Sequence, residues 1–268
     1  MLPLSIPSSS VVKDTAKTIM KRSPASTVIV CLFLLATFFT TQILLSGMLE
    51  LLFSESFILK NLTLLLLFIT VFWPVFMGTI RYFWVHTEQK EYEINAVFYY
   101  FSSLIRYKRA LKTVVLLVLR VFLIGFICLI PCMISSLFEH SWLYTTLNSD
   151  VPLWSANLQL ITDFLKIAGI ILTVCISLKY YLVPIVAVMD ENLYLMETVH
   201  ISEMISKQSL SAFANLIVSF FGWFLLSLLG IPLVYTLPYF LICYVVHCRY
   251  AIVNYNLNLE RVSRWQNE

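Results

Sequence analysis

The feature of this chain that most constrains its fold is a long stretch, from Gln208 to Cys248, that contains no Asp, Glu, Lys or Arg. As one helix it would be about 60 Å long, twice the roughly 30 Å thickness of the hydrocarbon core of a bilayer. The stretch must therefore fold back on itself. Gly230, Pro232 and Pro238 mark where the chain can turn. The pattern predicts a membrane-buried helical hairpin.

Composition extends this prediction to the whole chain. Hydrophobic residues make up 60% of the 268 residues and charged residues 12%, whereas a soluble domain carries about 25% charged residues. The basic residues lie mostly beside apolar segments and not on a soluble face, so we expect no nucleic-acid partner. The partners expected are the lipid bilayer and, for an assembly role, another membrane protein.

Six apolar segments are long enough to span a membrane. They run over residues 27–48, 62–82, 114–137, 167–189, 211–229 and 233–250. The sequence predicts an all-α, polytopic membrane protein with six transmembrane helices. Residues 1–25 are expected to form a basic N-terminal interfacial segment, residues 26–256 the six-span membrane domain, and residues 257–268 a cytoplasmic tail.

Lys and Arg are concentrated in connections expected on one side of the membrane. The N-terminal segment contains Lys13, Lys17, Lys21 and Arg22, and residues 81–112 contain six further basic residues. On the other side, residues 49–61 contain only Lys60 and residues 139–158 contain none. Because cytoplasmic loops retain positive charge, we expect both termini to be cytoplasmic and the protein to lie in the cell (inner) membrane.

Two cytoplasmic connections have the pattern of interfacial elbow helices. The first, residues 92–110, has an apolar stripe followed by three basic residues that can face lipid headgroups. The stripe is Ile94, Val97, Phe98, Phe101, Leu104 and Ile105, and the basic residues are Arg106, Lys108 and Arg109. The second, residues 193–207, has a polar stripe of Glu197, His200, Glu203 and Lys207.

Ligand-type residues are few. The six cysteines all fall in or at the ends of apolar segments, which is typical of small buried side chains. Glu197 and His200 form one Glu-x-x-His pair, whereas di-iron helical bundles use two such pairs. The alternative is that both residues belong to the solvated face of an amphipathic helix. We expect no metal and no other cofactor.

Arg120 is the most unusual charge, because it lies inside the third predicted span. An unsatisfied charge there costs at least roughly 2.5 kcal/mol. The residue either marks a substrate path, snorkels towards the headgroups, or makes a structural hydrogen bond. No nucleophile elbow, zinc helix or phosphate-binding glycine loop accompanies it.

Residues of the last hairpin and its preceding elbow resemble a bacterial family pattern. They are Ser202, Phe213, Ser219-Phe220-Phe221-Gly222-Trp223 and Pro238-Tyr239. On these residues the chain resembles the uncharacterised six-span family called domain of unknown function 975. That family is similar to the membrane region attached to some glycerophosphodiester phosphodiesterases. The resemblance covers residues 180–250 best and implies no catalytic residue.

Five residues are therefore candidate functional or packing positions: Arg120, Gly222, Trp223, Pro238 and Tyr239. The missing side chain of Gly222 would let the fifth span approach a neighbour closely. The expected function is that of a non-enzymatic accessory or assembly component of a membrane complex. The alternatives are a small-molecule transporter, which paired ionisable residues inside the spans would favour, and an intramembrane enzyme, which a facing pair of catalytic side chains would favour.

Overall fold

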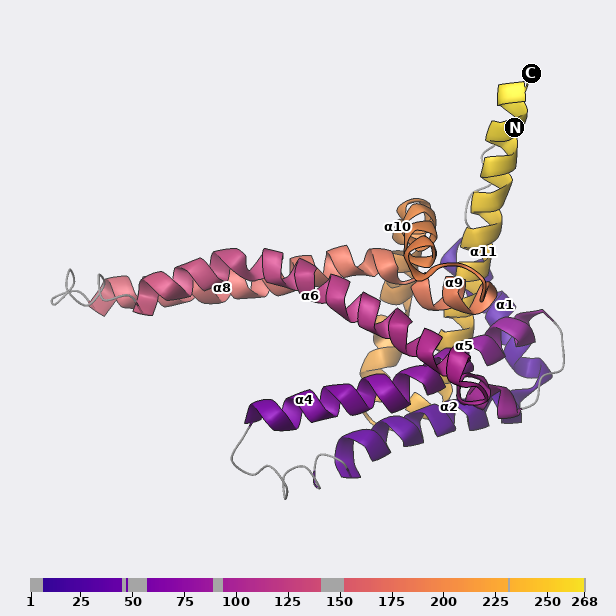
Figure 1. The fold of residues 1–268 in the computed structure, drawn as a ribbon, viewed down its shortest axis with the longest axis horizontal. Coiled ribbons are helices and arrows are strands. Elements are labelled where there is room, and N and C mark those ends of the chain that lie inside the picture. The colour runs from indigo at the N-terminus through magenta and orange to yellow at the C-terminus, as the bar shows by residue number, and fades with distance from the viewer. Residues whose placement is uncertain are drawn as a thin grey trace. The chain divides into compact units, whose positions relative to one another are not determined.

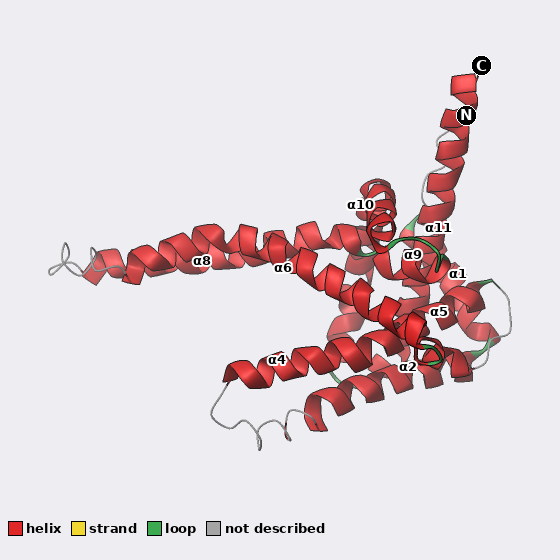
Figure 2. Cartoon of the chain, in the orientation of Figure 1, coloured by secondary structure: helices red, strands yellow, loops and turns green. Residues whose placement is uncertain are grey.

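The computed structural model describes residues 7–44, 47, 57–88, 94–140, 152–230 and 232–267, and these form helices joined by short connections (Figures 1 and 2). No strand occurs in these ranges. Six stretches are long and apolar enough to cross a membrane: Pro24–Ile43, Asn61–Thr87, Leu104–Leu137, Gln159–Met189, Leu195–Ser227 and Leu233–Leu257. The prediction of an all-α, polytopic membrane protein is confirmed.

The structure contains nine α-helices in the described ranges, labelled in Figure 1. In chain order they are α1 (Ser9–Arg22), α2 (Pro24–Phe39), α4 (Phe57–Leu67), α5 (Trp73–Thr87), α6 (Leu104–His140), α8 (Pro152–Ser177), α9 (Val183–Met189), α10 (Leu195–Ser227) and α11 (Leu233–Asn267). Two π-helical turns, Thr40–Leu44 and Phe68–Phe72, and two 3₁₀ helices, η3 (Ile94–Phe101) and η4 (Leu178–Tyr180), complete the list.

The chain divides into two compact units. We call Met1–Val115 together with Leu182–Glu268 the core unit, and Leu116–Tyr181 the hairpin unit. One boundary falls at an interruption of the fourth span, which the sequence analysis predicted as one helix over residues 167–189. Helix α8 ends at Ser177 and α9 begins at Val183. The helix breaks because the ring of Pro184 would clash with the carbonyl group four residues earlier, that of Tyr180.

The two elbow predictions have different outcomes. The first is only partly right, because η3 forms a separate element but residues 104–110 already belong to α6. The second is wrong, because residues 195–207 are the first half of an unbroken helix, α10. Neither Pro nor Gly occurs between Leu195 and Phe221 to interrupt it. The 33 residues of α10 make it about 50 Å long.

Helix α11 is the centre of the core unit. It packs against α1, α2, α5 and α10, and every residue from Leu241 to Cys248 is buried. A helix that is apolar on all faces needs such surroundings. Ring contacts between α10 and α11 show that the two helices are antiparallel. Phe220 lies 5.3 Å from Tyr239, and Phe213 lies 5.5 Å from His247, between ring centroids.

The basic N-terminal helix is packed into the core unit. Its apolar face, Val12, Ala16, Ile19 and Met20, is buried. The ammonium group of Lys13 donates to the Ser219 carbonyl oxygen at 3.0 Å and lies 4.6 Å from the Phe220 ring centroid. Helix α1 is therefore held against the fifth span, which its basic, interfacial sequence pattern did not indicate. At the other end of the chain, α11 continues as a helix through most of residues 257–268, the predicted tail.

One glycine permits a backbone contact in the core unit. A Cβ atom on Gly78 of α5 would lie 1.9 Å from the carbonyl oxygen of Val97 in η3, and 2.7 Å from the Val97 carbonyl carbon. Val97 itself is 1% exposed. Gly78 thus allows η3 to lie directly on α5, and it positions Tyr99 and Tyr100 beside the end of α5.

The hairpin unit consists of the second part of α6 and of α8, which lie side by side (Figure 1). Small residues line their contact. A Cβ on Gly169 would lie 2.9 Å from the Cys128 carbonyl oxygen, and the buried hydroxyls of Ser135 and Thr162 share a hydrogen bond of 2.6 Å. These contacts bring the two backbones together in the way that small residues do between membrane helices.

Candidate functional site

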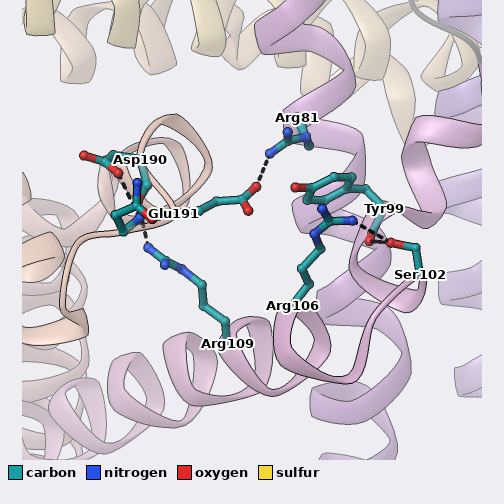
Figure 3. A network of polar contacts seen from close by, with 8 residues as sticks. Arg81, Tyr99, Ser102, Arg106, Arg109, Asp190 and Glu191 are labelled. Carbon is teal, nitrogen blue, oxygen red and sulfur yellow. Dashed lines mark hydrogen bonds and ion pairs between the residues drawn. The ribbon is translucent and has the colours of Figure 1, made fainter.

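Charged and aromatic side chains from four segments of the core unit meet in one place (Figure 3). They come from the end of α5, from η3, from the start of α6 and from the loop between α9 and α10. We call this group the arginine cluster: Arg81, Tyr99, Arg106, Arg109, Asp190 and Glu191. Segments more than 100 residues apart in the chain supply its ion pair, so only the tertiary fold assembles it.

Arg81 is the centre of the cluster. Its Nη1 donates to Glu191 Oε1 at 2.5 Å, and the two side chains are 19% and 31% exposed. The Tyr99 ring centroid lies 3.6 Å from Arg81 Cζ and 4.1 Å from Arg106 Cζ. Figure 3 shows the ring between the two guanidinium groups. A ring in this position interacts favourably with both cations through its negative faces.

Arg109 holds the backbone of the α9–α10 loop. Its Nη2 donates to the carbonyl oxygen of Asp190 at 2.7 Å and to that of Leu193 at 3.3 Å. The Asp190 carboxylate in turn accepts the backbone N–H of Asn192 at 2.8 Å. The prediction that Arg109 faces lipid headgroups is wrong, because the loop carbonyls engage its guanidinium group. Lys108, the neighbouring basic residue, is exposed.

The tyrosines of η3 are held in their neutral form. Burial raises the pKa of Tyr99, and a hydrogen bond to Glu191 raises it further. Burial also raises the pKa of Tyr100, which is 1% exposed. A phenol with a raised pKa donates a hydrogen bond and is a poor nucleophile at neutral pH. The contacts of the cluster join α5, η3, α6 and the α9–α10 loop.

Glu197, one residue of the Glu-x-x-His pair, has a structural role. The Glu197 carboxylate accepts the backbone N–H of Tyr194 at 3.2 Å, and so satisfies a group at the start of α10. His200 is exposed. Among the described residues no group of three or more His, Cys, Asp or Glu could hold a metal ion.

Arg120 lies in the hairpin unit, whereas the arginine cluster belongs to the core unit. Its Cζ is 5.8 Å from the Tyr180 ring centroid, and Lys179 Nζ is 4.8 Å from the same centroid. Lys179 was not singled out from the sequence. Arg120 is half-buried beside an aromatic ring and a second cation, an arrangement that none of the readings from the sequence described.

The other four candidate residues lie along the last hairpin. A Cβ atom on Gly222 would meet no described atom within 4 Å, so the close approach predicted for Gly222 is not made with the described residues of this chain. Trp223 is 42% exposed and lies 6.3 Å from the Tyr235 ring, between centroids. Pro238 is buried within α11. The Tyr239 hydroxyl donates to the Lys13 carbonyl oxygen at 3.4 Å.

A hollow of about 280 Å³ lies in the core unit, between α1, the end of α5 and α11. Its charged lining residue is Arg249, which donates to the Thr87 hydroxyl at 3.1 Å and lies 3.5 Å from a Glu88 carboxylate oxygen. The remaining lining is mostly apolar. This second group of charges joins the end of α5 to the middle of α11.

Sequence reasoning used the arginines of the cluster as markers of topology and as residues that can face lipid headgroups, and it did not single out Tyr99, Asp190 or Glu191. One signal could have found the cluster. Arg81, Arg106 and Arg109 lie on either side of the aromatic segment 98–101 in the sequence, and aromatic rings are stacking partners for guanidinium groups. No protein-family model, curated protein or solved structure matches the chain, so the resemblance to the six-span bacterial family stays a prediction.

Proposed function

We propose that this protein is a non-enzymatic component of the cell (inner) membrane that assembles with another membrane protein. The observation that carries the proposal is the exposure of the hairpin unit. Only 11% of the most apolar stretch of Leu104–Leu137 is buried within the protein, against 72% for Leu233–Leu257. Phe122, Leu137 and Phe164 are each at least 66% exposed. Such faces are available to a partner span as well as to lipid.

The arginine cluster supports a structural interpretation of the core unit. Its ion pair and its Arg109 hydrogen bonds are made within the chain, and its tyrosines have raised pKa values. General acid–base catalysis would instead need a group with a pKa close to neutral. The core unit then has a structural role, and the exposed α6–α8 hairpin is the part that contacts the partner.

A second candidate function, small-molecule transport, is favoured by one observation. Arg120 and Lys179 both lie inside candidate spans, and ionisable residues in that position often mark substrate paths. Purified protein in liposomes tests this candidate. For an assembly component we expect no ion-driven uptake. We also expect that extraction of native membranes in mild detergent recovers the protein together with one specific partner in repeated preparations. Robust uptake by the protein alone, without any recoverable partner, would contradict the proposed assembly function and favour small-molecule transport.

The proposed orientation, with both termini cytoplasmic, has its own test. The substitutions are Thr146→Cys, which lies outside the described residues, and Ser263→Cys, near the end of α11. In a background without the six native cysteines, an impermeant maleimide added to intact cells should label the first variant and spare the second. Labelling both variants after cell lysis is the control. If only Ser263→Cys were labelled in intact cells, the orientation would be the opposite of the one proposed.

A further inference from the structure

We propose that the hollow between α1, the end of α5 and α11 binds an anionic phospholipid, with the headgroup phosphate on Arg249 and part of an acyl chain on the apolar wall. The site lies entirely in the core unit and does not depend on the proposed partner protein. Its volume is about 280 Å³, whereas pockets that enclose a drug-sized ligand measure roughly 300–1,000 Å³. The hollow therefore takes the headgroup end of a lipid and not the whole molecule.

The hollow lies at the level where spans end. Arg22 lies two residues before the first candidate span, and Glu88 directly follows the second. The Ser23 hydroxyl and His86 Nε2 share a hydrogen bond of 2.7 Å, so these two span ends lie side by side. Arg249 is at the same level, because its Nη2 lies 3.5 Å from a Glu88 carboxylate oxygen. Charged residues at the ends of spans mark the headgroup region of a bilayer.

Arg249 can bind a phosphate while it keeps its contacts within the chain. Nη1 donates to the Thr87 hydroxyl at 3.1 Å, Nη2 lies 3.5 Å from Glu88 Oε1, and Cζ lies 5.7 Å from the Trp84 ring centroid. A guanidinium group has five N–H donors, so it can also donate to a phosphate oxygen. The contact with Glu88 is longer than the roughly 2.7–2.9 Å of a strong charge-assisted hydrogen bond. A phosphate that approaches more closely therefore competes well for the same guanidinium group.

A second cation gives the rim of the hollow an excess of positive charge. Thr15 and Ile19 line the hollow from α1. Arg22 follows Ile19 by three residues, so it lies on the same face of α1, and it is exposed. The described rim thus includes the guanidinium groups of Arg22 and Arg249 and the carboxylate of Glu88. Basic pockets between transmembrane helices bind acidic lipid headgroups, and this balance of charge favours such a headgroup.

The apolar wall favours a lipid over a free phosphate ion. Ile19, Val246 and Val253 line the hollow beside Arg249. Val253 follows Arg249 by four residues on the same face of α11, and it is 49% exposed. Tyr250, which also lines the hollow, is 36% exposed, and tyrosine is enriched where membranes meet water. An acyl chain covers this wall, whereas an inorganic phosphate ion leaves it in contact with water.

The test is a lipid titration of the full-length protein, purified in a neutral detergent and stripped of lipid. Phosphatidylglycerol is added, and the bound lipid is measured by native mass spectrometry. We expect Arg249→Gln to lower the affinity at least about tenfold, because it removes the donor to the phosphate. Lys17→Gln, an exposed neutralisation on the opposite face of α1, should change the affinity by less than about twofold.

Glu88→Gln is the matched control for the loss of the ion pair. It breaks the same contact as Arg249→Gln but removes the negative charge, so the affinity for phosphatidylglycerol should stay the same or rise. Melting temperatures of both variants establish that they are folded. If the two variants lose binding equally, the ion pair holds the helices and Arg249 is not a lipid ligand.

Three further measurements test the class of ligand and its position. Phosphatidylcholine, which has no net charge, should bind at least about tenfold more weakly than phosphatidylglycerol. Millimolar inorganic phosphate should not displace the lipid. Val253→Trp, which fills the hollow without a change of charge, should lower the affinity. Equal binding of the two lipids, displacement by inorganic phosphate, or unchanged affinity in both Arg249→Gln and Val253→Trp would each overturn the proposal.

Discussion

Gly78→Leu is expected to lower the melting temperature of the detergent-solubilised protein by about 10 °C, or to prevent folding. The new Cβ would lie 1.9 Å from the Val97 carbonyl oxygen. That neighbour is backbone, so no change of side-chain rotamer relieves the clash, and η3 must move away from α5. Overpacking of this kind costs about 3 kcal/mol or more, which corresponds to roughly 10 °C for a chain of this size. Thermal unfolding followed by tryptophan fluorescence measures the change.

Gly222→Leu is the matched control for that experiment. It introduces the same side chain into a helix of the same unit, but no described atom lies within 4 Å of its Cβ. We expect a melting temperature within about 2 °C of wild type, as for other exposed substitutions. Equal melting of the Gly78 variant and wild type would show that η3 does not lie on α5 in the folded protein.

Glu191→Gln is expected to destabilise the core unit by about 2 kcal/mol. The substitution removes the Glu191 carboxylate from the half-buried Arg81 guanidinium, which shares the Tyr99 ring with the Arg106 guanidinium. Fully buried pairs cost more to break and exposed pairs cost less, so a pair that is 19% and 31% exposed should fall between these limits. The measurement is again the melting temperature, with Asp14→Asn, which removes an exposed carboxylate, as the control.

A double-mutant cycle shows whether the loss belongs to the pair. Arg81→Gln combined with Glu191→Gln should be more stable than the sum of the two single effects indicates, because the double variant removes both charges of the pair. Additive effects would mean that Arg81 and Glu191 stabilise the protein independently, and that their ion pair does not hold the α9–α10 loop to α5.

Membrane insertion was readable from the sequence because it depends on local composition. An uncharged run such as residues 208–248 enters the bilayer whatever the rest of the chain does. Because this run is twice as long as one span, it must also contain a turn. The six spans and the all-α class follow from this local energetics. The same reasoning placed Arg120 inside a span. It did not reveal Lys179 and Tyr180 beside it, because those residues lie about 60 positions later and only the pairing of α6 with α8 brings them together.

Tertiary contacts decided the rest. Both Gly78 and Gly222 lie in apolar helices, and only the position of η3 makes the first one indispensable. Arg81 and Glu191 are 110 positions apart, so no local pattern predicts their ion pair. Residues 193–207 have the amphipathic pattern of a separate surface helix, yet their buried face packs within the core unit and α10 continues unbroken. Hydrophobicity determines which segments enter the bilayer, whereas side-chain packing and charge pairing determine which of those segments meet.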